Sequence, residues 1–219
     1  MPASQLTDLL WKGMRETLYM TLWSTALAYL IGLPMGVLLV VTDKEGLRPL
    51  KGVNVVLGII INLARSIPFL ILLIAVIPLT RAIVGKMVGS TATIVPLTLS
   101  AAPFIARIVE SSLKEVDSGV VQAARAMGAS PMQIIWKVLL MEAKPSLLLG
   151  AAIAITTILG YSAMAGIVGG GGLGDIAIRY GYYRYQTDTM LITVALLVVV
   201  VQLFQEIGAR AAKRIDRRL

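Results

Sequence analysis

Residues Val120–Leu140 read VVQAARAMGASPMQIIWKVLL, and this stretch separates apolar segments on either side. It contains the helix-forming run Gln122–Met127, then Gly128, then the pair Ser130-Pro131. A glycine just past a helix ends it, and Ser-Pro supplies a cap and a first-turn proline for the next one. The stretch therefore predicts two short helices separated by a break.

The chain on both sides of this stretch is strongly apolar. Of the 219 residues, 57% are hydrophobic and 15% are charged, and the mean hydropathy is +0.83. A helix needs about 20 mostly apolar residues to cross about 30 Å of hydrocarbon, where unpaired backbone groups are costly. We therefore predict an all-α polytopic membrane protein, a single domain over residues 1–219 with five transmembrane helices. The predicted spans are about 17–41, 55–78, 91–109, 147–168 and 190–207.

Basic residues are distributed unevenly between the segments that connect these spans. Thirteen Lys and Arg lie in the segment 42–54, in the central segment or in the C-terminal tail, and six lie on the other side. The positive-inside rule then places the N-terminus outside and the C-terminus in the cytoplasm. The segment of about 115–145, which contains the central stretch, is predicted to be cytoplasmic as well. A cleaved signal peptide is the competing interpretation of the first segment, but its apolar run is too long for one.

Composition also excludes several kinds of site. The chain has no Cys and no His, so we expect no disulfide, no catalytic residue and no metal site. Gly169–Gly174 reads GGGGLG and formally matches a dinucleotide fingerprint, but it follows an apolar span instead of a strand. We therefore expect no nucleotide site on this chain. The net charge is +8, but aromatic residues do not alternate with the basic ones, so we expect no nucleic-acid partner.

The central stretch resembles a motif of a known family. QAARAMGASPMQIIWKVLLMEAKP is similar to the cytoplasmic motif of ABC importer permeases, which is Glu-Ala-Ala, three residues, Gly, nine residues and Ile-x-Leu-Pro. Ala123, Ala124, Gly128 and Leu140 match the motif. Three positions depart from the motif: Gln122 replaces its glutamate, Val138 its isoleucine and Met141 its proline. A proline follows four residues later, at Pro145.

The resemblance extends from Thr17 to Gln205. NLARSIPFLILL, IVPLTLSAAPFIARIVESSL and GYSAMAGIVGGGGLGDIAIRYGYYRYQTDTMLITV are similar to segments of the membrane subunits of methionine importers. This resemblance implies a type I ABC importer fold, pairing with a second copy, two copies of a separate ATPase that holds ATP and Mg, and an external methionine-binding protein. A bacterial inner membrane is implied as well, with the N-terminus periplasmic and the C-terminus cytoplasmic. It also implies that eight residues couple the chain to that ATPase: Gln122, Ala123, Ala124, Arg125, Ala126, Met127, Gly128 and Ala129.

Three other functions are alternatives to this one. Permeases for other amino acids or for glycine betaine share parts of these motifs. A secondary transporter or channel would carry intramembrane acids or internal repeats, and no Asp or Glu lies in the central part of any predicted span. A passive scaffold would leave the alanine-rich helix of the central stretch unexplained.

Four residues inside the spans are candidates for the translocation path or its gate: Arg65, Ser66, Ser162 and Met164. A charge at mid-depth costs at least about 2.5 kcal/mol unless it faces protein or water. Arg65 therefore either lines a path, holds Ser66-Ile67-Pro68 in a broken helix, or pairs with carbonyls freed by Pro68. Met164, among small residues, either packs helices or closes a symmetric pore. Arg107 and Glu110 are spaced for a local ion pair.

Overall fold

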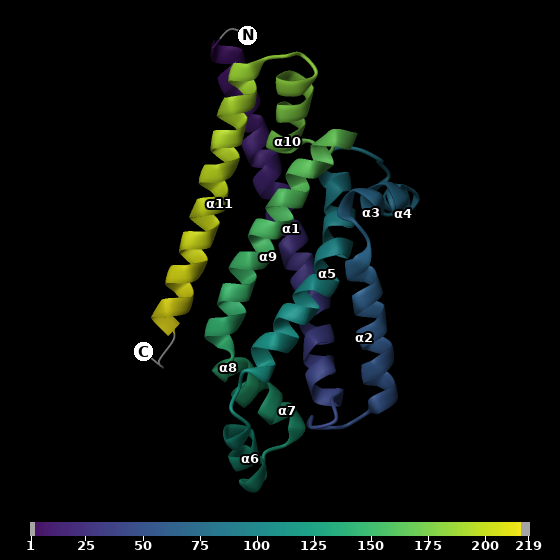
Figure 1. The fold of residues 1–219 in the computed structure, drawn as a ribbon, viewed down its shortest axis with the longest axis vertical. Coiled ribbons are helices and arrows are strands. Elements are labelled where there is room, and N and C mark those ends of the chain that lie inside the picture. The colour runs from purple at the N-terminus through teal and green to yellow at the C-terminus, as the bar shows by residue number, and fades with distance from the viewer. Residues whose placement is uncertain (1–2, 216–219) are drawn as a thin grey trace. The chain divides into compact units, whose positions relative to one another are not determined.

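The computed structural model describes residues 3–215, which form helices and connecting turns and include no strand (Figure 1). The predicted all-α class is confirmed. The α-helices are α1 Ala3–Thr42, α2 Lys51–Ser66, α3 Phe69–Ala75, α4 Ile77–Val84, α5 Ser90–Lys114, α6 Ser118–Ala126, α7 Pro131–Ile134, α8 Leu140–Glu142, α9 Lys144–Ala165, α10 Gly172–Ile176 and α11 Thr187–Ile215. Short π-helical turns, Ile135–Leu139 and Ala177–Tyr182, and a 3-10 turn, Gly166–Val168, extend them.

Four of these helical stretches are long and apolar enough to cross a membrane: those of α1, α5, α9 and α11. The pair α2 and α3 makes a fifth if it is counted as one broken span. The structure therefore supports the predicted multispanning architecture. Many large apolar side chains on these helices are exposed, Leu30 and Leu191 among them, as expected for surfaces that face lipid or other subunits.

The second predicted span differs from the expectation of one kinked helix over 55–78. Its helix ends at Ser66, and a new one begins at Phe69. Proline lacks an N–H and disfavours a helical conformation in the residue before it, which explains the break at Ile67 and Pro68. The Pro68 carbonyl then accepts hydrogen bonds from the N–H groups of Ile71 and Leu72, both at 3.0 Å, and so starts α3. By contrast, α1 runs through Pro34 without interruption.

The helices form two compact units, each assembled from three parts of the chain. One unit contains the described residues up to Leu27, then Ile67–Ala101 and Ile155–Gln205. The other contains Ala28–Ser66, Ala102–Ala154 and the described residues from Glu206 onward. Because α1 contributes residues to both units, the division does not cut the sequence into consecutive domains. The single permease domain over 1–219 stays a prediction.

Close approach of α1 and α5 organises the second of these units. A Cβ atom on Gly32 would lie 2.6 Å from the Ala102 carbonyl oxygen, and one on Gly36 would lie 2.6 Å from the Ala106 carbonyl oxygen. Both pairs are spaced by four residues, which is the small-xxx-small geometry of tightly packed membrane helices. Ala106 also belongs to a buried apolar cluster with Leu39 and Ile61. The two glycines therefore allow α1 and α5 to pack backbone against backbone.

The glycine-rich loop before α10 lies in the first unit and is held by α1. The Gly172 N–H donates to Glu16 Oε2 at 2.8 Å, and the Leu173 N–H donates to Thr17 Oγ1 at 2.8 Å. The amides at the start of α10 are thus already paired with side chains of the same chain. The loop follows a helical segment, as the apolar sequence before it predicts, and it returns the chain from α9 to α10.

Candidate functional site

Helix α6 carries most of the residues that the sequence assigns to coupling. Asp117 caps its start, because the Asp117 side chain accepts a hydrogen bond from the Gly119 N–H at 2.6 Å. Within the eight predicted coupling residues, Ala124 is buried and Met127 is 82% exposed. Gln122, Ala123, Arg125 and Ala126 are exposed as well. Of these residues, Ala124 is therefore the one that is buried in the chain, and the two exposed alanines, Gln122, Arg125 and Met127 face outward.

The end of α6 is fixed by a glycine in the left-handed region. Gly128 has φ of +78°. Its N–H donates to the Arg125 carbonyl at 3.0 Å, and the Ala129 N–H donates to the Ala124 carbonyl at 3.1 Å. These two bonds form a Schellman motif, which satisfies the last carbonyls of a helix and favours glycine at the left-handed position. The orientation in which the chain leaves α6 is therefore set by Gly128.

The next helix starts with a reciprocal cap. The Gln133 N–H donates to Ser130 Oγ at 3.3 Å, and the Ser130 N–H donates to Gln133 Oε1 at 2.8 Å, with Pro131 in the first turn. This is the capping box, which satisfies two otherwise free amides. The predicted succession of helix, break and helix is confirmed. Figure 1 shows α6 and α7 following one another after α5.

Helix α6 is tied to the turn that follows α1. Arg125 Nη2 donates to the Gly46 carbonyl at 3.1 Å. The same turn contacts α5, since Lys114 Nζ lies 2.8 Å from Asp43 Oδ2. This hydrogen bond from Lys114, with a second from the Lys44 N–H, holds the pKa of the Asp43 carboxyl below its ordinary value. The carboxylate is therefore charged at neutral pH and joins the turn to α5.

A chain of polar contacts continues from Lys114 toward α2. Lys114 Nζ lies 2.9 Å from Glu110 Oε1, and Glu110 also pairs with Arg107. Arg107 Nη2 donates to Asn62 Oδ1 at 2.8 Å and to the Gly58 carbonyl at 3.2 Å. The predicted Arg107–Glu110 ion pair is confirmed. We define these contacts, from Arg125 through Asp43 and Lys114 to Arg107 and α2, as the polar relay.

Glu110 is the central acceptor of the polar relay, and we expect its removal to destabilise the protein. Its side chain is only 13% exposed and pairs with two cations. Glu110→Ala leaves both cations without this carboxylate in a partly buried site, which should lower the free energy of unfolding by about 2 kcal/mol. The shift of the thermal unfolding midpoint in detergent measures this effect.

Glu206 provides a matched control for this prediction. It pairs with Arg210 at 2.6 Å across one helical turn, but its side chain is 59% exposed. Exposed pairs of this kind contribute about 0.5 kcal/mol, so Glu206→Ala should leave the midpoint almost unchanged. Equal shifts for the two variants would show that the polar relay adds nothing beyond an ordinary surface pair.

The predicted path residues in α2 lie in its last turn. Arg65 is exposed, and its guanidinium makes no hydrogen bond or ion pair with residues 3–215. Ser66 Oγ donates to the Asn62 carbonyl at 2.8 Å. Arg65 therefore neither holds the break nor pairs with carbonyls freed by Pro68 in this structure. Of its three interpretations, the lining of a path is the one that remains, and it stays a prediction.

The predicted gate residues in α9 differ in exposure. Ser162 is buried, and its Oγ donates to the Leu159 carbonyl of the same helix at 2.7 Å. Its hydroxyl is thus used within α9. Met164 is 39% exposed. Just before them, the ring of Tyr161 stacks on Phe69 of α3, with ring centroids 4.6 Å apart, a contact that the sequence did not predict.

Comparison with known proteins places this geometry in context. The sequence model of the family described as "Binding-protein-dependent transport system inner membrane component" matches residues 28–219. A probable D-methionine transport system permease protein, MetI, of Vibrio cholerae is 51% identical over 212 residues, which cover 97% of this chain and 94% of that protein. The methionine import system permease protein MetP of Bacillus subtilis is 41% identical over 217 residues, covering 99% and 97%.

Solved structures agree with the sequence relatives. A chain from inward-facing conformations of the MetNI methionine ABC transporter has a TM-score of 0.97 and 48% sequence identity, covering 99% of this chain and 100% of that one. A chain of an amino acid ABC transporter crystallised with histidines has a TM-score of 0.78 and 22% identity, covering 96% of each chain. The second likeness concerns the fold alone.

Proposed function

The chain belongs to the family of binding-protein-dependent transport system inner membrane components, and from this membership we propose that it is the membrane-spanning subunit of an ATP-driven methionine importer. The observation that carries the proposal is the exposed helix α6, joined by the polar relay to the membrane helices. The relatives named for methionine transport, which match nearly the whole chain, support the substrate.

Helix α6 acts as a lever between a separate ATPase and the membrane helices. Its small exposed side chains allow another protein surface to approach closely, as small residues do between packed helices. Movement imposed on α6 is transmitted through Arg125 to the turn after α1, and through Lys114 and Glu110 to α5 and α2. The coupling is conformational, and ATP is hydrolysed on the partner.

The assembly contains two copies of this chain and two copies of the ATPase, with ATP and Mg held by the ATPase. The central segment and the C-terminus face the cytoplasm, and the N-terminus faces the periplasm, where an external methionine-binding protein delivers substrate. Methionine crosses between the two copies of this chain. Met164, exposed in the single chain, closes the path by meeting its counterpart, and Arg65 lines it.

Substrate competition tests this function. In vesicles that hold this chain with its ATPase and binding protein, unlabelled methionine at 100 times its half-saturating concentration should suppress ATP-dependent uptake of labelled methionine about 100-fold, by simple mass action. Glycine betaine and histidine at the same concentration should leave it nearly unchanged. Uptake of labelled glycine betaine or histidine instead of methionine would overturn the substrate assignment while leaving the importer mechanism in place.

A further inference from the structure

The helical stretch between α6 and α9 has an exposed apolar side that lies outside the polar relay. The stretch comprises α7, the π-helical turn Ile135–Leu139 and α8. Met132 is 63% exposed, Trp136 61% and Met141 60%, and we call these three residues the outer row. Met132 and Trp136 are one α-helical turn apart, and a π-helix aligns residues five positions apart. The π-helical turn therefore brings Met141 into line with Trp136.

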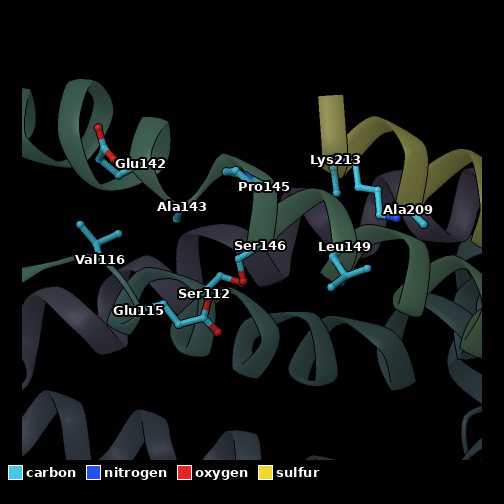
Figure 2. Close-up of a pocket in the computed structure, with 11 residues that line it drawn as sticks. Ser112, Glu115, Val116, Glu142, Ala143, Pro145, Ser146, Leu149, Ala209 and Lys213 are labelled. Atoms are coloured by element: carbon cyan, nitrogen blue, oxygen red, sulfur yellow. The ribbon is translucent and has the colours of Figure 1, made fainter. Parts of the chain in front are cut away.

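The opposite side of the same stretch packs inward. Ile134, Leu139 and Ala143 are buried. Figure 2 shows the junction between α8 and α9, where Ala143 and Ser146 point toward α5, and Ser146 Oγ donates to Ser112 Oγ at 3.0 Å. The stretch is thus held against α5 by one side, which leaves the outer row facing away from α5.

The inward side shows how close this stretch lies to the hydrocarbon. Leu139 lines a pocket with Val40, in the first predicted span, and with Leu113, four residues past the third. Ala143 lines another pocket with Ser112, three residues past the third predicted span. At 1.5 Å per residue, Leu113 and Ser112 lie about 6 and 4.5 Å beyond the hydrocarbon, within a headgroup layer of about 5 to 7 Å. The stretch therefore runs at the depth of lipid headgroups.

The charges beside the outer row fit an anionic lipid surface. The charged residues of 131–144 are Lys137, Glu142 and Lys144, which give a net charge of +1. Both lysines are exposed, and neither makes an ion pair within residues 3–215. Tryptophan is enriched where hydrocarbon meets headgroups, because its ring is apolar and its N–H is polar. Lysines at this depth are attracted to lipid phosphates.

We propose that the outer row lies in the lipid interface, with Trp136 among the headgroups and the ammonium groups of Lys137 and Lys144 paired with phosphates of anionic phospholipids. The stretch that follows α6 is thereby fixed to the membrane, so α6 moves relative to an anchored neighbour. The competing occupant is the ATPase, which meets small side chains on α6. The proposal rests on the membrane-spanning fold and not on the transported substrate.

Spin labelling of the complete chain in vesicles of phosphatidylcholine and phosphatidylglycerol tests what surrounds the outer row. The chain has no Cys, so Trp136→Cys and, on α6, Met127→Cys each take one nitroxide label before the ATPase is added. Molecular oxygen concentrates in lipid, and a nickel chelate concentrates in water. The label at 136 should collide more often with oxygen whether or not the ATPase is bound, whereas the label at 127 should collide more often with nickel until the ATPase covers it.

Two results of this measurement would overturn the proposal. More frequent collisions with nickel at 136 would place the outer row in water. Loss of both kinds of collision at 136 when the ATPase binds would assign the outer row to the ATPase.

Fluorescence of Trp136 tests the anionic lipid without altering the outer row. Trp11→Phe combined with Trp23→Phe leaves Trp136 as the only tryptophan of the chain. Phosphatidylglycerol brominated on its acyl chains should then quench Trp136 more than the same fraction of brominated phosphatidylcholine, because a lysine near an anionic surface enriches anionic lipid about fivefold. Absence of quenching by either lipid would overturn the proposal.

Variants of the lysines locate this preference in the same fluorescence measurement. Lys137→Gln combined with Lys144→Gln should make the two brominated lipids quench equally. Lys12→Gln combined with Lys86→Gln removes the same charge outside this stretch and should preserve the difference. A preference for phosphatidylglycerol that survives the changes at Lys137 and Lys144 would overturn the proposal.

Discussion

Gly128→Val is expected to reduce ATP-dependent methionine uptake at least about tenfold while the ATPase of the assembled complex continues to hydrolyse ATP. Gly128 has φ of +78°, and a Cβ atom there would meet nothing within 4 Å. The cost is therefore conformational. A non-glycine residue in the left-handed region costs about 1 to 2 kcal/mol, and a β-branched residue costs more. To escape this strain, the chain must give up the Schellman motif, so the end of α6 changes direction. With its end redirected, α6 no longer transmits the movement of the ATPase to the membrane helices.

Gly85 supplies the matched control for this experiment. It ends α4 with φ of +75°, and a Cβ atom there would also meet nothing within 4 Å. Gly85→Val carries the same backbone strain outside α6, so its uptake should stay within about twofold of the unmodified chain. Gly128→Asn should recover most of the loss, because asparagine tolerates the left-handed conformation. Equal defects in the two valine variants would show that strain alone, and not the coupling helix, explains the result.

Gly36→Leu is expected to prevent accumulation of the folded subunit. A Cβ atom at this position would lie 2.6 Å from the Ala106 carbonyl oxygen and 2.7 Å from Val109 Cβ. Backbone oxygen cannot move away as a flexible side chain does, so α1 and α5 must separate. Overpacking of this kind costs about 3 kcal/mol or more. The yield of monodisperse protein after detergent extraction, and its thermal unfolding midpoint, measure the loss.

Gly52, at the start of α2, is the corresponding control. No atom lies within 4 Å of a Cβ built there, and leucine is a better helix former than glycine by about 0.8 kcal/mol. Gly52→Leu should therefore give a normal yield. A normal yield from Gly36→Leu would contradict the close contact between α1 and α5.

The sequence predicted well the features that are encoded locally. Gly128 and the Ser130-Pro131 pair specify a helix end and a helix start through hydrogen bonds within six residues, so α6 and α7 were accessible from the sequence. The Arg107–Glu110 pair is equally local. Gly32 and Gly36 also form a local signal, because the pattern Gly-x-x-x-Gly in an apolar segment indicates close helix packing.

The features that were not predicted depend on contacts distant in sequence or on the choice of a buried face. Asp43 meets Lys114, and Asn62 meets Arg107, across more than 40 residues, and no local pattern marks such partners. Helix α9 is apolar on nearly all sides, so periodicity does not tell which residues are buried. For this reason Ser162 and Met164 looked alike in the sequence, although the first is buried and the second is exposed.

The central claim is that this chain transports methionine only as the membrane part of an ATP-driven assembly. The most direct measurement is uptake of labelled methionine into vesicles that contain this chain, the ATPase and the binding protein, with each component and then ATP omitted in turn. The account predicts uptake with all components present and none beyond background when any one is missing. Movement of methionine down its gradient through vesicles that contain this chain alone would contradict it, and α6 would then have no coupling role.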